Sequence, residues 1–158
     1  IPDKTTFKRS SVTIVAGYIF HIGMFISFFF FAPHILFFKD LIGISWPALP
    51  TTVIDAFAVI TIIALLAVLV NRLTNKVMRF LTNFEDILTW FLTFLPLLTG
   101  YIAFHRIGFT GPSLLAIHLL SVELLLVVFP FTKLMHTFTL FLARWYNGAI
   151  SGYRGVAS

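Results

Sequence analysis

Residues 51–71 read TTVIDAFAVITIIALLAVLVN, a run with a single charged side chain, Asp55, near its start. About 20 apolar residues in an α-helix cross the roughly 30 Å hydrocarbon core of a bilayer. The run is continuously apolar and does not alternate with polar residues, as a membrane barrel strand would. This stretch therefore predicts a membrane-spanning helix.

Three further stretches have the same character, and the predicted spans are residues 11–38, 51–71, 84–105 and 113–143. Hydrophobic residues make up 59% of the 158-residue chain, which is more apolar surface than a soluble domain of this size can bury. We expect an all-α transmembrane helical bundle that forms one domain over residues 1–158, with residues 144–158 as a tail. The lipid bilayer would cover the excess apolar surface.

Basic residues are distributed unevenly between the two ends of these spans. Nine of the 11 Lys and Arg residues precede the first span, lie between the second and third, or follow Pro130, while Lys39 and Arg106 fall on the other side. The positive-inside rule then predicts that both ends of the chain and the middle loop are cytoplasmic. Topology accounts for the net charge of +5, and no nucleic-acid partner is expected.

The chain contains no cysteine, so it supplies no disulfide, no thiolate zinc site and no protein ligand for an iron–sulfur cluster. It opens on Ile1 and Pro2, with neither an initiating Met nor a signal peptide. We expect the sequence to belong to a longer polypeptide.

All five histidines, His21, His34, His105, His118 and His136, lie within or at the ends of predicted spans. Ionisable side chains in hydrocarbon are costly, and they usually face the bundle interior and serve a function there. Because successive spans run in opposite directions, His21 and His136 belong to the cytoplasmic half of the membrane. His34 and His118 belong to the outer half. Two haems stacked across the bilayer, each between two histidines, would suit this arrangement.

The spacing of the histidines along an ideal helix fits haem ligation better for His118 and His136 than for His21 and His34. His118 and His136 are 18 residues apart, which is about five turns and roughly 27 Å on one helix, so both would project from the same face. His21 and His34, 13 residues apart, would differ by about 140° unless Pro33 turns His34 back. His105, at the outer end of the third span, is the alternative partner for His118.

Other functions remain open at this point. The histidines could hydrogen-bond between helices in a purely structural membrane anchor, or the chain could be a small transporter with Glu123 near the midplane. Glu123 itself is either a proton relay or a protonated carboxyl hydrogen-bonded to another helix. The sequence has neither the tight ligand clusters of zinc sites nor the histidine-rich motifs of membrane di-iron enzymes. A b-type haem spectrum would separate these classes.

Three motifs suggest a family. FHIG at residues 20–23, TNFEDIL at 82–88 and, above all, His118 followed by FPFTKLMH at 129–136 resemble the gamma subunit of respiratory nitrate reductase. The similarity covers nearly the whole chain. The wider family of membrane cytochromes b also includes subunits of heterodisulfide-reductase-like and sulfite-reduction-type respiratory complexes.

The resemblance implies an electron-transfer subunit of an oxidoreductase complex that is not catalytic alone. Its cofactor would be haem b, as two haems or as one, with quinone exchanging near the outer haem. Iron–sulfur and catalytic subunits would dock on the cytoplasmic side of a prokaryotic inner membrane. Family members usually have five spans, so a further helix is expected before the first one seen here.

The family's ligands carry over to His21, His136 and His118. In the nitrate reductase subunit the second histidine of the first ligand helix lies ten residues after the first, and here Phe31 stands at that position. Either His34 or His105 would then complete the outer pair. Arg106 is a candidate counter-charge for a haem propionate, although an ordinary interfacial position explains it equally well.

Overall fold

The computed structural model describes residues 4–108 and 112–156, with side chains described from residue 10 onward. This part of the chain is all helical and contains no β-strand, as predicted. The α-helices are α1 (Lys4–Phe29), α2 (Ala32–Ile42), α3 (Thr51–Thr74), α4 (Lys76–Leu81), α5 (Phe84–His105), α6 (Ser113–Val128) and α7 (His136–Tyr153), and two 3-10 turns, η1 (Phe129–Phe131) and η2 (Lys133–Met135), join α6 to α7.

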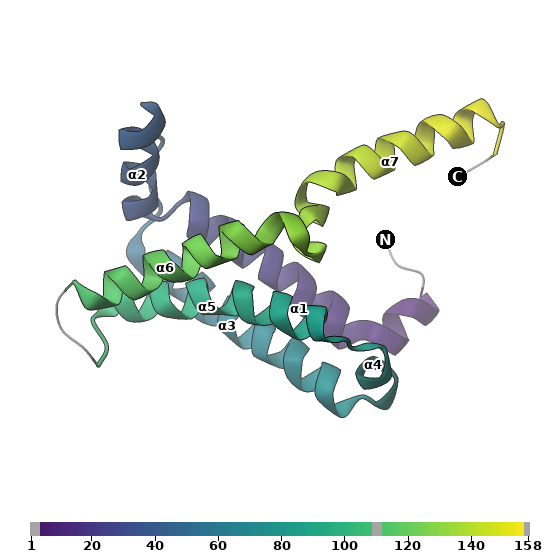
Figure 1. The fold of residues 1–158 in the computed structure, drawn as a ribbon, viewed down its shortest axis with the longest axis horizontal. Coiled ribbons are helices and arrows are strands. Elements are labelled where there is room, and N and C mark those ends of the chain that lie inside the picture. The colour runs from purple at the N-terminus through teal and green to yellow at the C-terminus, as the bar shows by residue number, and fades with distance from the viewer. Residues whose placement is uncertain (1–3, 109–111, 157–158) are drawn as a thin grey trace.

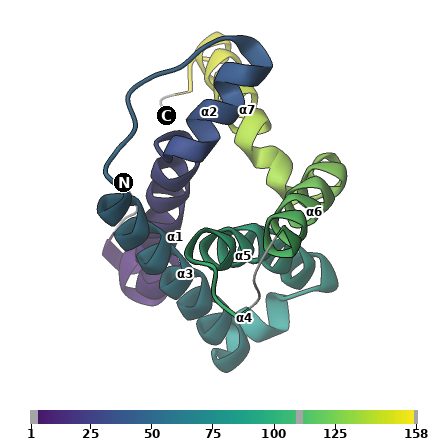
Figure 2. The same ribbon diagram turned by 90° about the vertical axis from the view of Figure 1, so that its left-hand side faces the viewer.

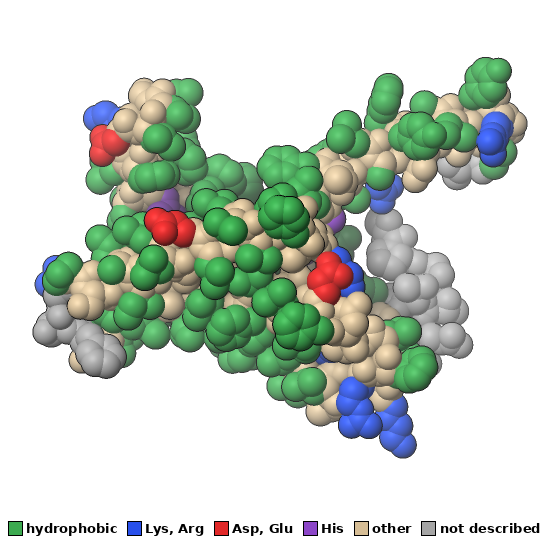
Figure 3. Space-filling model, in the orientation of Figure 1, with side chains coloured by type: hydrophobic (Ala, Val, Ile, Leu, Met, Phe, Trp, Pro, Cys, Tyr) green, Lys and Arg blue, Asp and Glu red, His purple; other side chains and the backbone are tan. Residues whose placement is uncertain are grey.

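Four segments are long and apolar enough to cross a membrane, namely Ser10–Phe29, Thr51–Thr74, Phe84–His105 and Ser113–Phe131. The prediction of an all-helical chain with four candidate membrane-spanning helices is therefore confirmed. Large apolar side chains cover much of the exterior (Figure 3), as expected for a surface that faces lipid.

The first span ends earlier than the sequence predicted, at Phe29 and not at residue 38. The helix is interrupted at Phe30 and Phe31, and Pro33 lies in the first turn of α2, where a residue without an N–H group is tolerated. Trp46 Nε1 donates to the Phe29 carbonyl at 2.6 Å, so a backbone acceptor freed by the break stays paired. The break places His34 on a different helix from His21.

The fourth span is also shorter than predicted, since α6 ends at Val128 and not at residue 143. Pro130 lies in η1, and Thr132 is extended with φ −126° and ψ 172°. Proline cannot donate a helical hydrogen bond and its ring clashes with the preceding turn. The assumption that His118 and His136 lie on one continuous helix was therefore wrong.

The spans pack in sequence-adjacent pairs. α1 lies along α3, α5 lies along α6, and a smaller contact between α3 and α5 joins the two pairs. Within the described residues, α1 and α6 share no extensive interface, and Figure 2 shows them on opposite sides of the bundle's central space. At the α1–α3 contact a Cβ on Gly23 would overlap the Thr61 hydroxyl, so only glycine permits this close approach.

The helices α2 and α7 project from the four-helix bundle (Figure 1). α7 packs mainly against η2, and none of its residues is buried in the described chain. Each projecting helix follows a break in the chain that has a proline within or just after it, Pro33 or Pro130, and each carries a histidine in its first turn.

Candidate functional site

Four of the five histidines meet as two pairs, each joining segments far apart in the sequence. His21 of α1 lies beside His136, the first residue of α7, with ring centroids 6.0 Å apart. His34 of α2 lies beside His118 of α6, with centroids 6.4 Å apart. These are the two pairings that depth in the membrane predicted.

The fifth histidine lies elsewhere. His105 Nε2 is 3.0 Å from Asp55 Oδ1, at the start of α3, and its ring packs against Tyr101. Of the two residues that the sequence left open as the partner of His118, the structure brings His34 to it and directs His105 to a carboxylate.

In the His34–His118 pair the ring planes are nearly parallel, at 16°. The rings of Phe28 and Phe31 flank His34, whose Nδ1 is 3.0 Å from the Phe28 carbonyl oxygen. A carbonyl can only accept, so Nδ1 carries the proton and Nε2 keeps its lone pair.

His118 is supported by α5. Its Nδ1 is 3.3 Å from Thr99 Oγ1, and the Thr99 hydroxyl donates to the Leu95 carbonyl at 2.8 Å. Thr99 Oγ1 also lies 2.9 Å from Ser121 Oγ on α6. When the single Thr99 proton is directed to Leu95 or Ser121, Oγ1 accepts from His118 Nδ1, and Nε2 is the unprotonated nitrogen of the neutral ring. Gly100 lies against the ring, because a Cβ there would be 3.0 Å from His118 Cε1.

The His21–His136 pair is more exposed, and its ring planes lie at 80°. His21 Nδ1 is 2.7 Å from the carbonyl oxygen of Gly17, one turn earlier in α1. His136 Nδ1 is 2.7 Å from the carbonyl oxygen of Lys133 in η2. All four paired histidines thus direct Nδ1 to an oxygen, and no Nε2 among them is hydrogen-bonded within the described residues.

An ionic network lies next to His136. Lys133 Nζ donates to Asp86 Oδ1 at 2.8 Å, and Arg72 Nη1 is 3.2 Å from Asp86 Oδ2. The hydrogen bond to the Asp86 carboxylate raises the pKa of the Lys133 ammonium, so this group stays charged at neutral pH. Asp86 also closes a capping box with Asn83 at the start of α5.

The pairs can be tested for their fit to a metal bound between two imidazoles. With nitrogen–metal bonds of about 2.1 Å and about 1.1 Å from nitrogen to ring centre, the centroids would be roughly 6.4 Å apart. The observed 6.0 and 6.4 Å agree with this estimate. In the described residues no group of three or more His, Cys, Asp or Glu could hold a metal ion by itself. Each pair could supply two imidazole ligands to a group such as haem, which brings the remaining ligands itself.

Two charged residues singled out from the sequence are not part of either pair. Arg106 caps the end of α5 in the left-handed conformation, with φ 53°, and is exposed. Glu123 is also exposed, and it makes no hydrogen bond or ion pair with any side chain that the structure describes. The predicted hydrogen bond from Glu123 to another helix is therefore not found in the described part of this chain.

Sequence reasoning did not identify Thr99, Gly100 or the Lys133 carbonyl as supports for the histidines. α5 contains several threonines, and nothing in their spacing separates Thr99 from Thr93, which hydrogen-bonds to carbonyls of its own helix. The rotation of α5 against α6 decides which of them meets a histidine.

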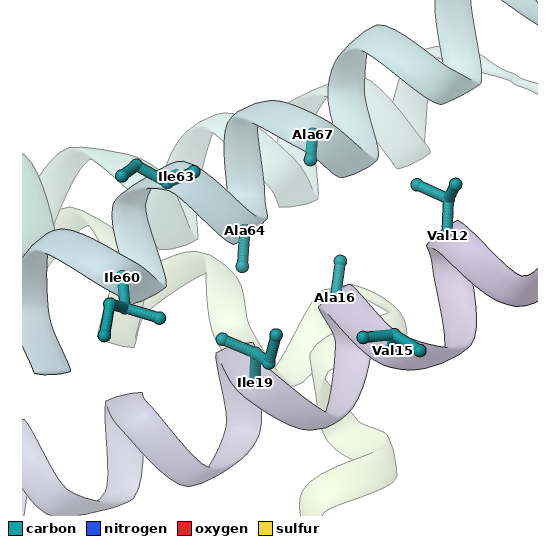
Figure 4. Close-up of a pocket in the computed structure, with 8 residues that line it drawn as sticks. All are labelled: Val12, Val15, Ala16, Ile19, Ile60, Ile63, Ala64 and Ala67. Carbon is teal, nitrogen blue, oxygen red and sulfur yellow. The ribbon is translucent and has the colours of Figure 1, made fainter.

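A separate groove lies between α1 and α3 (Figure 4), with a volume of about 290 Å³. Its lining is wholly apolar, from Val12, Val15, Ala16 and Ile19 of α1 and Ile60, Ile63, Ala64 and Ala67 of α3. The groove contains no histidine or charged group and offers no chemistry beyond contact with an apolar chain.

No family model matches this chain, and no solved structure matches it. A protein of Nitratidesulfovibrio vulgaris (strain Hildenborough), whose name states no function, is 36% identical to it over 146 residues. The alignment covers 90% of this chain and 63% of that relative, so the chain spans less than two thirds of the relative's length.

Proposed function

We propose that this chain is a membrane cytochrome b subunit that carries electrons between the quinone pool and an iron–sulfur partner subunit. The observation that carries the proposal is the meeting of four histidines as two pairs, with centroids 6.0 and 6.4 Å apart, in a bundle of four apolar helices. Interhelical hydrogen bonding alone does not account for these pairs, because the rings of a pair do not bond to each other in the described structure.

In this proposal His21 and His136 hold one haem b, and His34 and His118 hold the other. The oxygen at each Nδ1 fixes the tautomer, orients the ring and makes Nε2 a better ligand. Haem held by these two histidine pairs would supply one-electron transfer. The protein's contribution is to hold four neutral imidazoles at two depths.

The membrane sides, the partner subunits and the quinone site are proposed from the distribution of basic residues and from the resemblance to the gamma subunit of respiratory nitrate reductase. The end of the bundle with Arg72 and Lys133 would face the cytoplasm of a prokaryotic cell, together with both chain ends, and would receive the iron–sulfur and catalytic subunits. Quinone would exchange at the opposite end, near His34 and His118. Asp55 and His105, which are paired there, are candidates to exchange protons with quinone.

Haem stoichiometry tests the proposal. A reduced-minus-oxidised spectrum of the purified full-length protein should show b-type haem, and haem quantification should give two per chain. His118→Ala and His136→Ala should each lose one haem, while His105→Ala, the matched control, should keep both. Colourless protein would contradict the proposal and leave a structural anchor or a transporter as the function. Unchanged haem content in His136→Ala would contradict the assignment of His136 as a haem ligand.

A further inference from the structure

His136 differs from the other three paired histidines in how its position is fixed. His21 and His118 lie within long helices, and His34 follows a break that Trp46 ties to the end of α1. His136 instead begins α7, which packs mainly against η2 and buries no residue in the described chain. Its placement therefore depends on what holds η2.

Lys133, the first residue of η2, is held at both its backbone and its side chain. Its backbone N–H donates to Glu85 Oε1 at 2.9 Å, and its Nζ donates to Asp86 Oδ1 at 2.8 Å. Its carbonyl oxygen accepts from His136 Nδ1 at 2.7 Å. The first turn of α5 is thus connected to the His136 ring through one residue.

The connection continues into α3, because Arg72 also reaches Asp86, at 3.2 Å. Exposed ion pairs contribute little by themselves, and Lys133 is about half exposed, with a side-chain exposure of 51%. The backbone hydrogen bond to Glu85 is different, because it holds the N–H of the same residue whose carbonyl oxygen accepts from His136. The residues on either side of Lys133, Thr132 and Leu134, are buried.

We infer that Glu85, Asp86 and Lys133 are positioning residues that aim the His136 ring at its metal site, with Glu85 as the critical contact. The inference rests on the proposed function, since it concerns ligation of the haem between His21 and His136. The His34–His118 pair has its own supports on α5 and should not depend on Glu85.

The rate of haem loss to excess apomyoglobin, followed by absorbance, tests this inference. His118→Ala leaves the His21–His136 haem alone, and in that background Glu85→Ala should speed haem loss about tenfold, as loss of a ligand's supporting hydrogen bond typically does. Glu85→Gln keeps an oxygen acceptor and should restore a rate within about twofold of the parent. In the His136→Ala background, Glu85→Ala should change nothing.

Lys76→Ala is the matched charge control, because Lys76 is exposed at the same end of the bundle and forms no ion pair with a described residue. It should leave both rates unchanged. Equal acceleration by Glu85→Ala in both backgrounds, or none in the His118→Ala background, would overturn the inference while the cytochrome proposal stands. A parent protein without haem would overturn the proposed function itself.

Discussion

The two histidine pairs are built on the same plan but supported differently. Each pair combines a histidine inside a long helix, His21 or His118, with one in the first turn of a helix that follows a break, His34 or His136. The His34–His118 rings are partly buried and nearly parallel, whereas the His21–His136 rings are exposed and lie at 80°.

The two pairs differ in how the neighbouring helix α5 supports them. α5 supplies Thr99 and Gly100 directly to His118, so the contact is part of the α5–α6 packing. At the other pair, α5 is connected to His136 through Lys133, whose N–H donates to Glu85 and whose carbonyl oxygen accepts from His136 Nδ1. In each pair, a break in the chain sets the direction of the helix that carries His34 or His136. The neighbouring helix α5 then supports the two pairs in different ways.

The largest expected effect is at Gly100. A Cβ there would already lie 3.0 Å from His118 Cε1, so Gly100→Leu should displace the ring and remove the haem of the His34–His118 pair. Haem quantification should fall from two per chain to one. Gly148→Leu, at a glycine with no atom near its Cβ position, is the control and should keep both haems. Retention of two haems in Gly100→Leu would show that this pair does not need the close approach.

An intermediate effect is expected at Thr99. Thr99→Val preserves the shape of the side chain but removes the acceptor for His118 Nδ1. Haem bound between His34 and His118 should be lost about tenfold faster, while the other haem is unaffected. Thr93→Val removes a hydroxyl that bonds only to its own helix and should leave both rates near the parent value. If both threonine variants behave alike, the contact to His118 has no special role.

The smallest effect on the pairs is expected at Glu123, which is five residues from His118 and therefore about 140° away around α6. Glu123→Leu should leave both haems in place. Removing an exposed carboxyl from the middle of a span should favour membrane insertion of α6 by about 2 kcal/mol, measurable in a translocon insertion assay. A loss of quinol-linked haem reduction in this variant would instead identify Glu123 as a proton relay.

Several features of the fold could be predicted from residues 51–71 and the three similar stretches. Continuous apolar runs of this length form helices in a bilayer because every backbone group must be paired inside the segment. The expected pairing of His21 with His136 and of His34 with His118 also followed from their places along the predicted spans. The helix ends near residues 30 and 129 could not be predicted from the sequence. Pro33 and Pro130 indicate a break in the helix, but they do not fix the direction of the chain after it.

The sequence by itself therefore determined the four apolar helices that are long enough to span a membrane, and which histidines were expected to pair. Only the tertiary structure decided that His34, and not His105, lies beside His118, and that Thr99, Gly100 and Lys133 support the rings. The physical reason is that depth depends on the number of residues along one helix. A contact between side chains also depends on how helices rotate and bend against each other, which distant residues set together.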